Sequence, residues 1–129
     1  MTPDDRRATL TRARDLWNAG DYWRAHEALE TVWRSILGDA DQVGDADQAR
    51  VWQGLIQAAA ALLHLGRGNA HGVTVQGGAA LAKLAGPQHA TVELETVRFR
   101  ARLARALAGE GDPPQLEFRA NDGHHDQRL

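Results

Sequence analysis

The near absence of strand-like alternation is the feature that most constrains how this chain can fold. Alanine, leucine and arginine dominate the sequence, and β-branched residues are scattered rather than gathered in runs. Apolar residues recur instead at the spacing of amphipathic helices. We therefore predict an all-α fold.

Glycine, proline and capping residues divide the chain into five predicted helices. Asp21 and Asn69 are suited to cap helix N-termini, and Gly20 and Gly38 follow the ends of the first two helices. The expected helices cover residues 3–19, 21–37, 46–65, 69–85 and 88–108. Because their connections are short, we expect a single-domain antiparallel bundle of about five helices.

The fourth predicted helix is unusually rich in glycine, with Gly72, Gly77 and Gly78 in its interior. Each interior glycine costs a helix about 1 kcal/mol relative to alanine. Close approach of a neighbouring helix over these glycines would compensate for that cost. We therefore predict tight packing against this helix.

The last part of the chain differs from the rest. We expect residues 1–110 to form the bundle and residues 111–129 to form a C-terminal extension that is partly disordered. Leu116 and Phe118 alternate with polar residues, so a short extended segment can pack back on the bundle. In the fifth helix, we interpret four arginines as a solvated face: Arg98, Arg100, Arg102 and Arg105.

Charge and composition exclude several classes of protein. Fifteen Lys and Arg against 17 Asp and Glu give a formal net charge of -2, which argues against a nucleic-acid partner. The chain has no cysteine, and so neither disulfides nor thiolate metal sites. The N-terminus lacks a signal-peptide pattern, and the longest apolar stretch, residues 58–63, is too short to cross a bilayer. We expect a cytoplasmic protein with no membrane partner.

The second predicted helix carries an unusual stripe of polar and aromatic residues. At about 100° per residue, His26 and Glu30 lie about 40° apart, and Trp33 lies about 20° to the other side of His26. A soluble helix would normally place aliphatic residues on such a stripe. The stripe is therefore either a satisfied polar network or a site.

A second polar stripe lies on the third predicted helix, where Gln53, Gln57 and His64 fall within about 40° of one another. If the second and third helices pack antiparallel, His26 and Glu30 face Gln57 and His64 across one groove. We predict a polar cluster between these two helices.

This cluster allows four interpretations. It is a small-ligand pocket, a metal site, a homodimerisation or interaction module built around Trp23, or a purely structural network. The metal interpretation, a metal-binding protein or a metal-dependent hydrolase, uses His26, Glu30 and His64 as ligands of a divalent ion, because His26 and Glu30 have i, i+4 spacing. The ligand interpretation uses a larger set of residues: Tyr22, His26, Glu27, Glu30, Trp33, Gln53, Gln57 and His64.

The sequence leaves open whether the chain is an enzyme. A His–Glu pair can support general acid–base catalysis. No nucleophile is marked, since the chain has no cysteine and Ser35 has no evident partner, so acyl transfer through a covalent intermediate is not expected.

Two blocks of the sequence are similar to a known family. The first is Asn18-x-Gly20-Asp21-Tyr22-Trp23-x-Ala25-His26-Glu27-x-Leu29-Glu30-x-x-Trp33, and the second runs from Gln53 through Gln57 and His64 to Gly72. Together they resemble the signature of domain-of-unknown-function family 309. The resemblance implies a small helical bundle with His26, Glu27, Glu30, Trp33, Gln57 and His64 at motif positions, and it implies no activity. The aspartate-rich segment 38–47 and the polar C-terminus depart from the family pattern.

Overall fold

A computed structural model describes residues 2–37, 46–85 and 95–118. Five α-helices make up most of this part of the chain, which confirms the predicted all-α fold. The helices are α1 (Pro3–Asn18), α2 (Tyr22–Leu37), α3 (Ala46–Gly66), α4 (Ala70–Leu84) and α5 (Thr96–Leu107). No helix within the described ranges is both long enough and apolar enough to cross a membrane.

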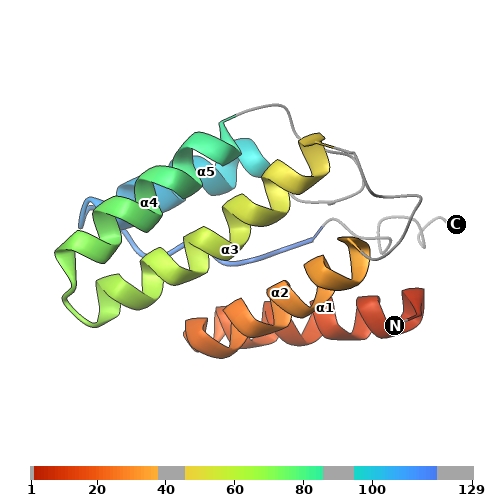
Figure 1. Cartoon of the computed structure of the whole chain (residues 1–129). Coiled ribbons are helices and arrows are strands. Elements are labelled where there is room, and N and C mark those ends of the chain that lie inside the picture. Colours follow the sequence, from red (N-terminus) through yellow and green to blue (C-terminus); the bar gives the residue numbers. More distant parts are fainter. Residues whose placement is uncertain (1, 38–45, 86–94, 119–129) are drawn as a thin grey trace, which may run out of the picture.

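The helix ends follow the capping signals in the sequence. Asp21 accepts a hydrogen bond from the backbone N–H of Arg24 at the start of α2, and Asn69 accepts one from Gly72 N–H at the start of α4. Between α1 and α2 the chain turns at Gly20, whose φ of 84° is a left-handed conformation that favours glycine. The short turn makes α1 and α2 an antiparallel pair (Figure 1).

One predicted helix boundary is wrong. We expected the fifth helix to begin at residue 88, but α5 begins at Thr96. The Glu95 backbone is extended, and its carboxylate accepts hydrogen bonds from the N–H groups of Val97 and Arg98. A helix cannot run through its own N-cap, so Glu95 sets the start of α5. Residues 86–94 lie outside the described residues.

The extended segment after α5 packs into the bundle, as predicted from Leu116 and Phe118. In Figure 1 it runs between the α1–α2 pair and the other helices. Leu116 is fully buried, and Asn18 on α1 holds it by donating to its C=O and accepting from its N–H. The predicted disordered part, residues 119–129, lies outside the described residues.

Trp17 is the centre of the core. Its ring is 1% exposed and contacts Tyr22 of α2 edge-on, with the ring centroids 5.5 Å apart. Phe99 of α5 lies 5.6 Å away, centroid to centroid, and the indole N–H donates to the C=O of Pro114. One side chain therefore joins α1, α2, α5 and the extended segment.

The closest helix packing is between α3 and α4. A Cβ on Gly72 would lie 2.3 Å from Cγ of His64, and one on Gly77 would lie 2.8 Å from Leu107 of α5. These two glycines therefore have the close neighbours that the sequence predicted. Gly78 does not, because nothing lies within 4 Å of a Cβ built there.

This difference predicts opposite effects of the same substitution on one helix. Gly72→Ala should destabilise the fold by about 1–3 kcal/mol, because His64 must leave its position over the glycine. Gly78→Ala should stabilise it by about 0.5–1 kcal/mol, because alanine favours the helix and meets no neighbour. Urea unfolding of both variants checks the pair. Equal effects of the two substitutions would contradict the close approach at Gly72.

Candidate functional site

The outer face of α2 carries most of the motif singled out in the sequence. The buried residues of α2 lie on one side of the helix: Ala25, Ala28, Leu29, Val32 and Ile36. Five residues on the opposite side fall within an arc of about 80° at 100° per residue. We call them the α2 stripe: Trp23, Glu27, Glu30, Arg34 and Leu37. The stripe is long and narrow, and it mixes apolar groups at its ends with charges between them.

Trp23 and His26 stack at the N-terminal end of this face. Their rings are within 5° of parallel with centroids 6.3 Å apart, and Trp23 is 54% exposed. The Nδ1 atom of His26 is enclosed, has no hydrogen-bond partner in the described part of the chain, and lies 3.7 Å from Oε1 of Glu30. That distance is too long for a hydrogen bond. His26 is therefore held by packing against Trp23 rather than by a polar network.

Glu30 lies between His26 and Arg34, each four residues away on α2. Its Oε1 is 3.7 Å from His26 and 3.8 Å from Nη2 of Arg34. Both contacts have the helical i, i+4 spacing. The Arg34 pair is at the surface, so it stabilises the helix by only ~0.3–0.5 kcal/mol. The carboxylate stays accessible to another group.

The polar residues of α3 face α4 and not α2. Oε1 of Gln57 accepts a hydrogen bond of 2.7 Å from Nζ of Lys83, and the His64 ring packs over Gly72. The prediction of one cluster between α2 and α3 is therefore wrong about the partners of these two residues. Gln53, the third residue of this stripe, is exposed.

The hydrogen bonds at the start of α4 fix the role of His64. The side-chain oxygen of Asn69 accepts from Gly72 N–H at 3.0 Å, so its nitrogen faces Nδ1 of His64 at 3.2 Å and donates to it. His64 therefore accepts at Nδ1 and braces the cap of α4. This contact gives His64 a structural role at the start of α4.

The remaining predicted residues divide between core and surface. Tyr22 is half-buried against Trp17, and burial raises the pKa of its hydroxyl above 10.0. Trp33 is half-buried and packs against the core, whereas Glu27 is exposed. Tyr22 and Trp33 are thus parts of the core and its margin.

The proposed metal ligands do not come together. Within residues 2–37, 46–85 and 95–118, no group of three or more His, Cys, Asp or Glu side chains is arranged to hold a metal ion. His64 is engaged at the α3–α4 turn, while His26 and Glu30 lie on α2. The set His26, Glu30 and His64 is therefore not assembled as a site.

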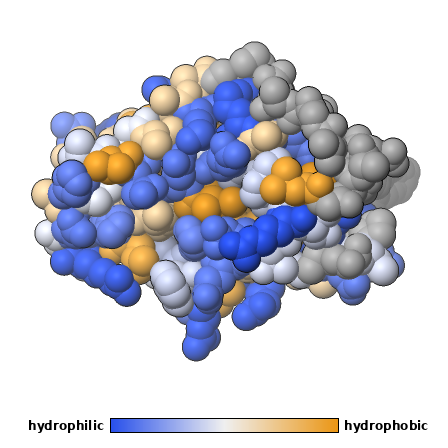
Figure 2. Space-filling model, in the orientation of Figure 1, coloured by the Kyte–Doolittle hydropathy of each residue, from blue (hydrophilic) through white to orange (hydrophobic). Residues whose placement is uncertain are grey.

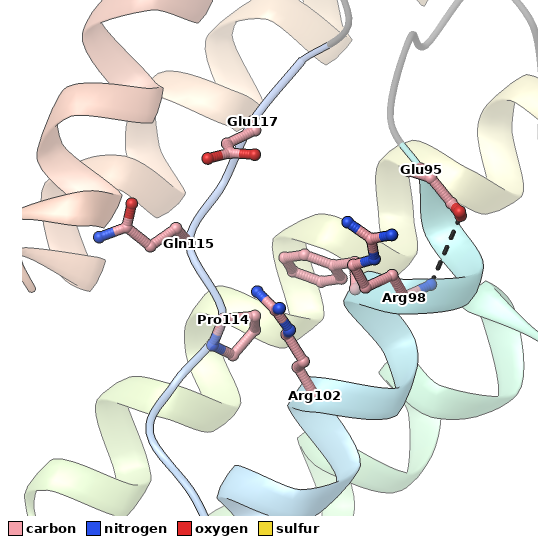
Figure 3. A pocket seen from close by; sticks show the side chains of 7 residues that line it. Glu95, Arg98, Arg102, Pro114, Gln115 and Glu117 are labelled. Carbon is pink, nitrogen blue, oxygen red and sulfur yellow. Dashed lines mark hydrogen bonds between the residues drawn. The ribbon is translucent and has the colours of Figure 1, made fainter.

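Sequence reasoning missed a groove on the other side of the core. It lies between α5 and the extended segment, and Figure 3 shows Arg98 and Arg102 reaching toward that segment. The residues that line this groove are Glu95, Arg98, Phe99, Arg102, Pro114, Gln115 and Glu117. The signal in the sequence was the i, i+4 pair of arginines, which we had interpreted as a solvated face.

The other two arginines of that predicted face behave differently. Arg100 is half-buried, and its Nε donates to the C=O of Leu81 at 2.8 Å. Arg105 is exposed and donates to the C=O of Glu110 at 3.4 Å. The prediction of a uniformly solvated face is therefore wrong for Arg100.

These features define an all-α bundle with an exposed aromatic face on α2. Residues 10–75, just over half of the chain, match the family described as Domain of unknown function (DUF309). The chain belongs to this family.

One relative is described as an uncharacterized protein of Aquifex aeolicus (strain VF5), 31% identical over 111 residues. That alignment covers 84% of this chain, and this chain spans 31% of the length of the relative. No solved structure gives a significant match to the chain.

The raised pKa of Tyr22 predicts how stability depends on pH. Because burial disfavours the phenolate in the folded state, the protein should keep this contribution below pH 10 and lose it as the pH rises further. The chain has one tyrosine, so its absorbance titration reports Tyr22 alone. The folded protein should titrate above the midpoint found in urea, and Tyr22→Phe should remove the corresponding fall in stability. Identical midpoints in the folded and unfolded chain would contradict this assignment.

Proposed function

We propose that this protein is an interaction module that associates through the α2 stripe. The observation that carries the proposal is Trp23, which is 54% exposed although it is one of the largest apolar side chains in the protein. Tryptophan is strongly enriched among the residues that carry most of the binding energy in protein interfaces. Leu37, at the other end of the stripe, is 48% exposed.

The stripe is complementary to itself at its two ends and at Glu27 and Arg34, which favours a second copy of this chain as the partner. Trp23 and Leu37 are 14 residues apart, or about 21 Å along the helix. In an antiparallel pair of α2 helices related by a twofold axis near Glu30, Trp23 meets Leu37 of the partner subunit at both ends. The same pairing places the exposed Glu27 close to Arg34 of the partner subunit. At the axis the two Glu30 carboxylates face each other, each beside the Arg34 of its own helix.

The size of the stripe sets the expected strength of association. One face of a 16-residue helix is smaller than the ~800 Å² per partner that stable interfaces bury. The dimer should therefore be weak, with a dissociation constant of about 10–100 μM.

Charge reversal tests this pairing. Glu27→Arg or Arg34→Glu places like charges opposite each other in the dimer, and each should weaken association about tenfold or more. The double variant restores opposite charges and should recover most of the lost affinity. Sedimentation equilibrium from about 10 μM to about 1 mM measures all four proteins.

The controls separate association from folding. Val75→Asp changes another exposed apolar residue, on α4, and should leave association unchanged. Circular dichroism checks that each variant is folded. A wild-type chain that stays monomeric throughout this range contradicts the proposal of a second copy, as does a double variant that is no better than the single ones.

A further inference from the structure

The groove between α5 and the extended segment is an open surface separate from the α2 stripe. It continues into an adjoining cavity of about 270 Å³, and the two share Arg102, Pro114 and Gln115. One wall is a helix, and the other is an extended stretch of backbone (Figure 3). Elsewhere on the surface, along the middle of the face that Figure 2 shows, apolar residues lie between hydrophilic side chains.

Two cations, Arg98 and Arg102, line this groove together with two carboxylates, Glu95 and Glu117, and neither cation has a partner among the described residues. Arg98 and Arg102 are exposed, and no ion pair joins either guanidinium to another described residue. Glu95, the nearest acidic residue on the same helix, uses its carboxylate to cap α5. Arg98 and Arg102 therefore both face the groove without an ion-pair partner among the described residues.

The extended segment also presents, at Gln115, backbone groups that are unpaired among the described residues. On one side it is held by α1, since Trp17 donates to the C=O of Pro114 and Asn18 bonds both backbone groups of Leu116. In an extended chain the N–H and C=O groups of successive residues point to opposite edges. The N–H and C=O of Gln115 therefore point away from α1, and neither has a hydrogen-bond partner among the described residues.

We propose that this groove binds an extended peptide with acidic side chains at alternate positions. The peptide pairs with the free edge at Gln115 as an added strand, and its carboxylates meet Arg98 and Arg102. The spacings agree, because four residues of helix rise about 6 Å and two residues of strand rise about 6.6 Å. This site is independent of the α2 stripe.

A small anion is the alternative occupant, and it makes different contacts. Phosphate would use the two arginines and leave the backbone of Gln115 without a partner. A peptide uses both features, so the response of the Gln115 amide distinguishes the two.

The test is a titration of ¹⁵N-labelled protein with a short blocked peptide, acetyl-Thr-Glu-Thr-Glu-Thr-amide, followed by amide chemical shifts. The expected result is saturable binding below about 1 mM, with a downfield shift of the Gln115 amide. The double variant Arg98→Gln/Arg102→Gln should bind about tenfold or more weakly, whereas Arg12→Gln, an exposed arginine on α1, should bind as the wild type does.

Two further probes make the result decisive. The same peptide with N-methylated glutamates, which cannot donate from those positions, should bind at least about tenfold more weakly. Inorganic phosphate should not shift the Gln115 amide. The proposal is overturned by no binding up to about 1 mM, by equal binding of the N-methylated peptide, or by phosphate giving the same shifts.

Discussion

The close approach of α3 to α4 is the constraint on which the rest of this structure depends. With no side chain at Gly72, the His64 ring can rest directly on the α4 backbone, where Asn69 fixes it. At the other end of the pair, Gln57 accepts from Lys83, and Arg50 donates to the C=O of the same residue. Gln57, His64 and Arg50 on α3 are therefore engaged by α4 and its cap rather than by α2.

Trp23 and the charged residues of α2 are left at the surface. Helix α2 buries its apolar side and turns Trp23, Glu27 and Arg34 outward. Trp17 and Asn18 hold the extended segment against α1. Because that segment is tied on one side only, its other edge forms a groove with α5. The α2 stripe and the groove beside α5 thus arise from different contacts within the bundle.

Much of the fold could be predicted from the sequence because local signals decide it. Asp21 and Asn69 cap the helices that they were expected to cap, and the alternation of Leu116 and Phe118 gave the extended segment. The start of α5 was missed because Glu95 resembles an ordinary residue in a helical first turn until its cap bonds are seen. Capping of this kind depends on one side-chain rotamer, which no periodicity encodes.

The candidate site was harder to predict because helical periodicity places residues on a face but does not say which neighbour covers it. His64 and Gln57 share a face of α3, as expected, yet that face meets α4. Gly72 was the available clue, since a glycine opposite a large ring indicates close contact. The groove beside Arg98 and Arg102 was missed for the same reason, because periodicity does not show that the segment after α5 folds back beside these arginines.

His26 and His64 lie in separate parts of the bundle, and a double-mutant cycle measures whether they interact. Unfolding free energies are measured for His26→Ala, His64→Ala and the double variant. We expect His64→Ala to destabilise the fold by about 1–2 kcal/mol, His26→Ala to change it little, and the coupling energy to be below about 0.5 kcal/mol. A coupling energy of about 1 kcal/mol or more would mean that the two histidines form one cluster, contrary to this structure.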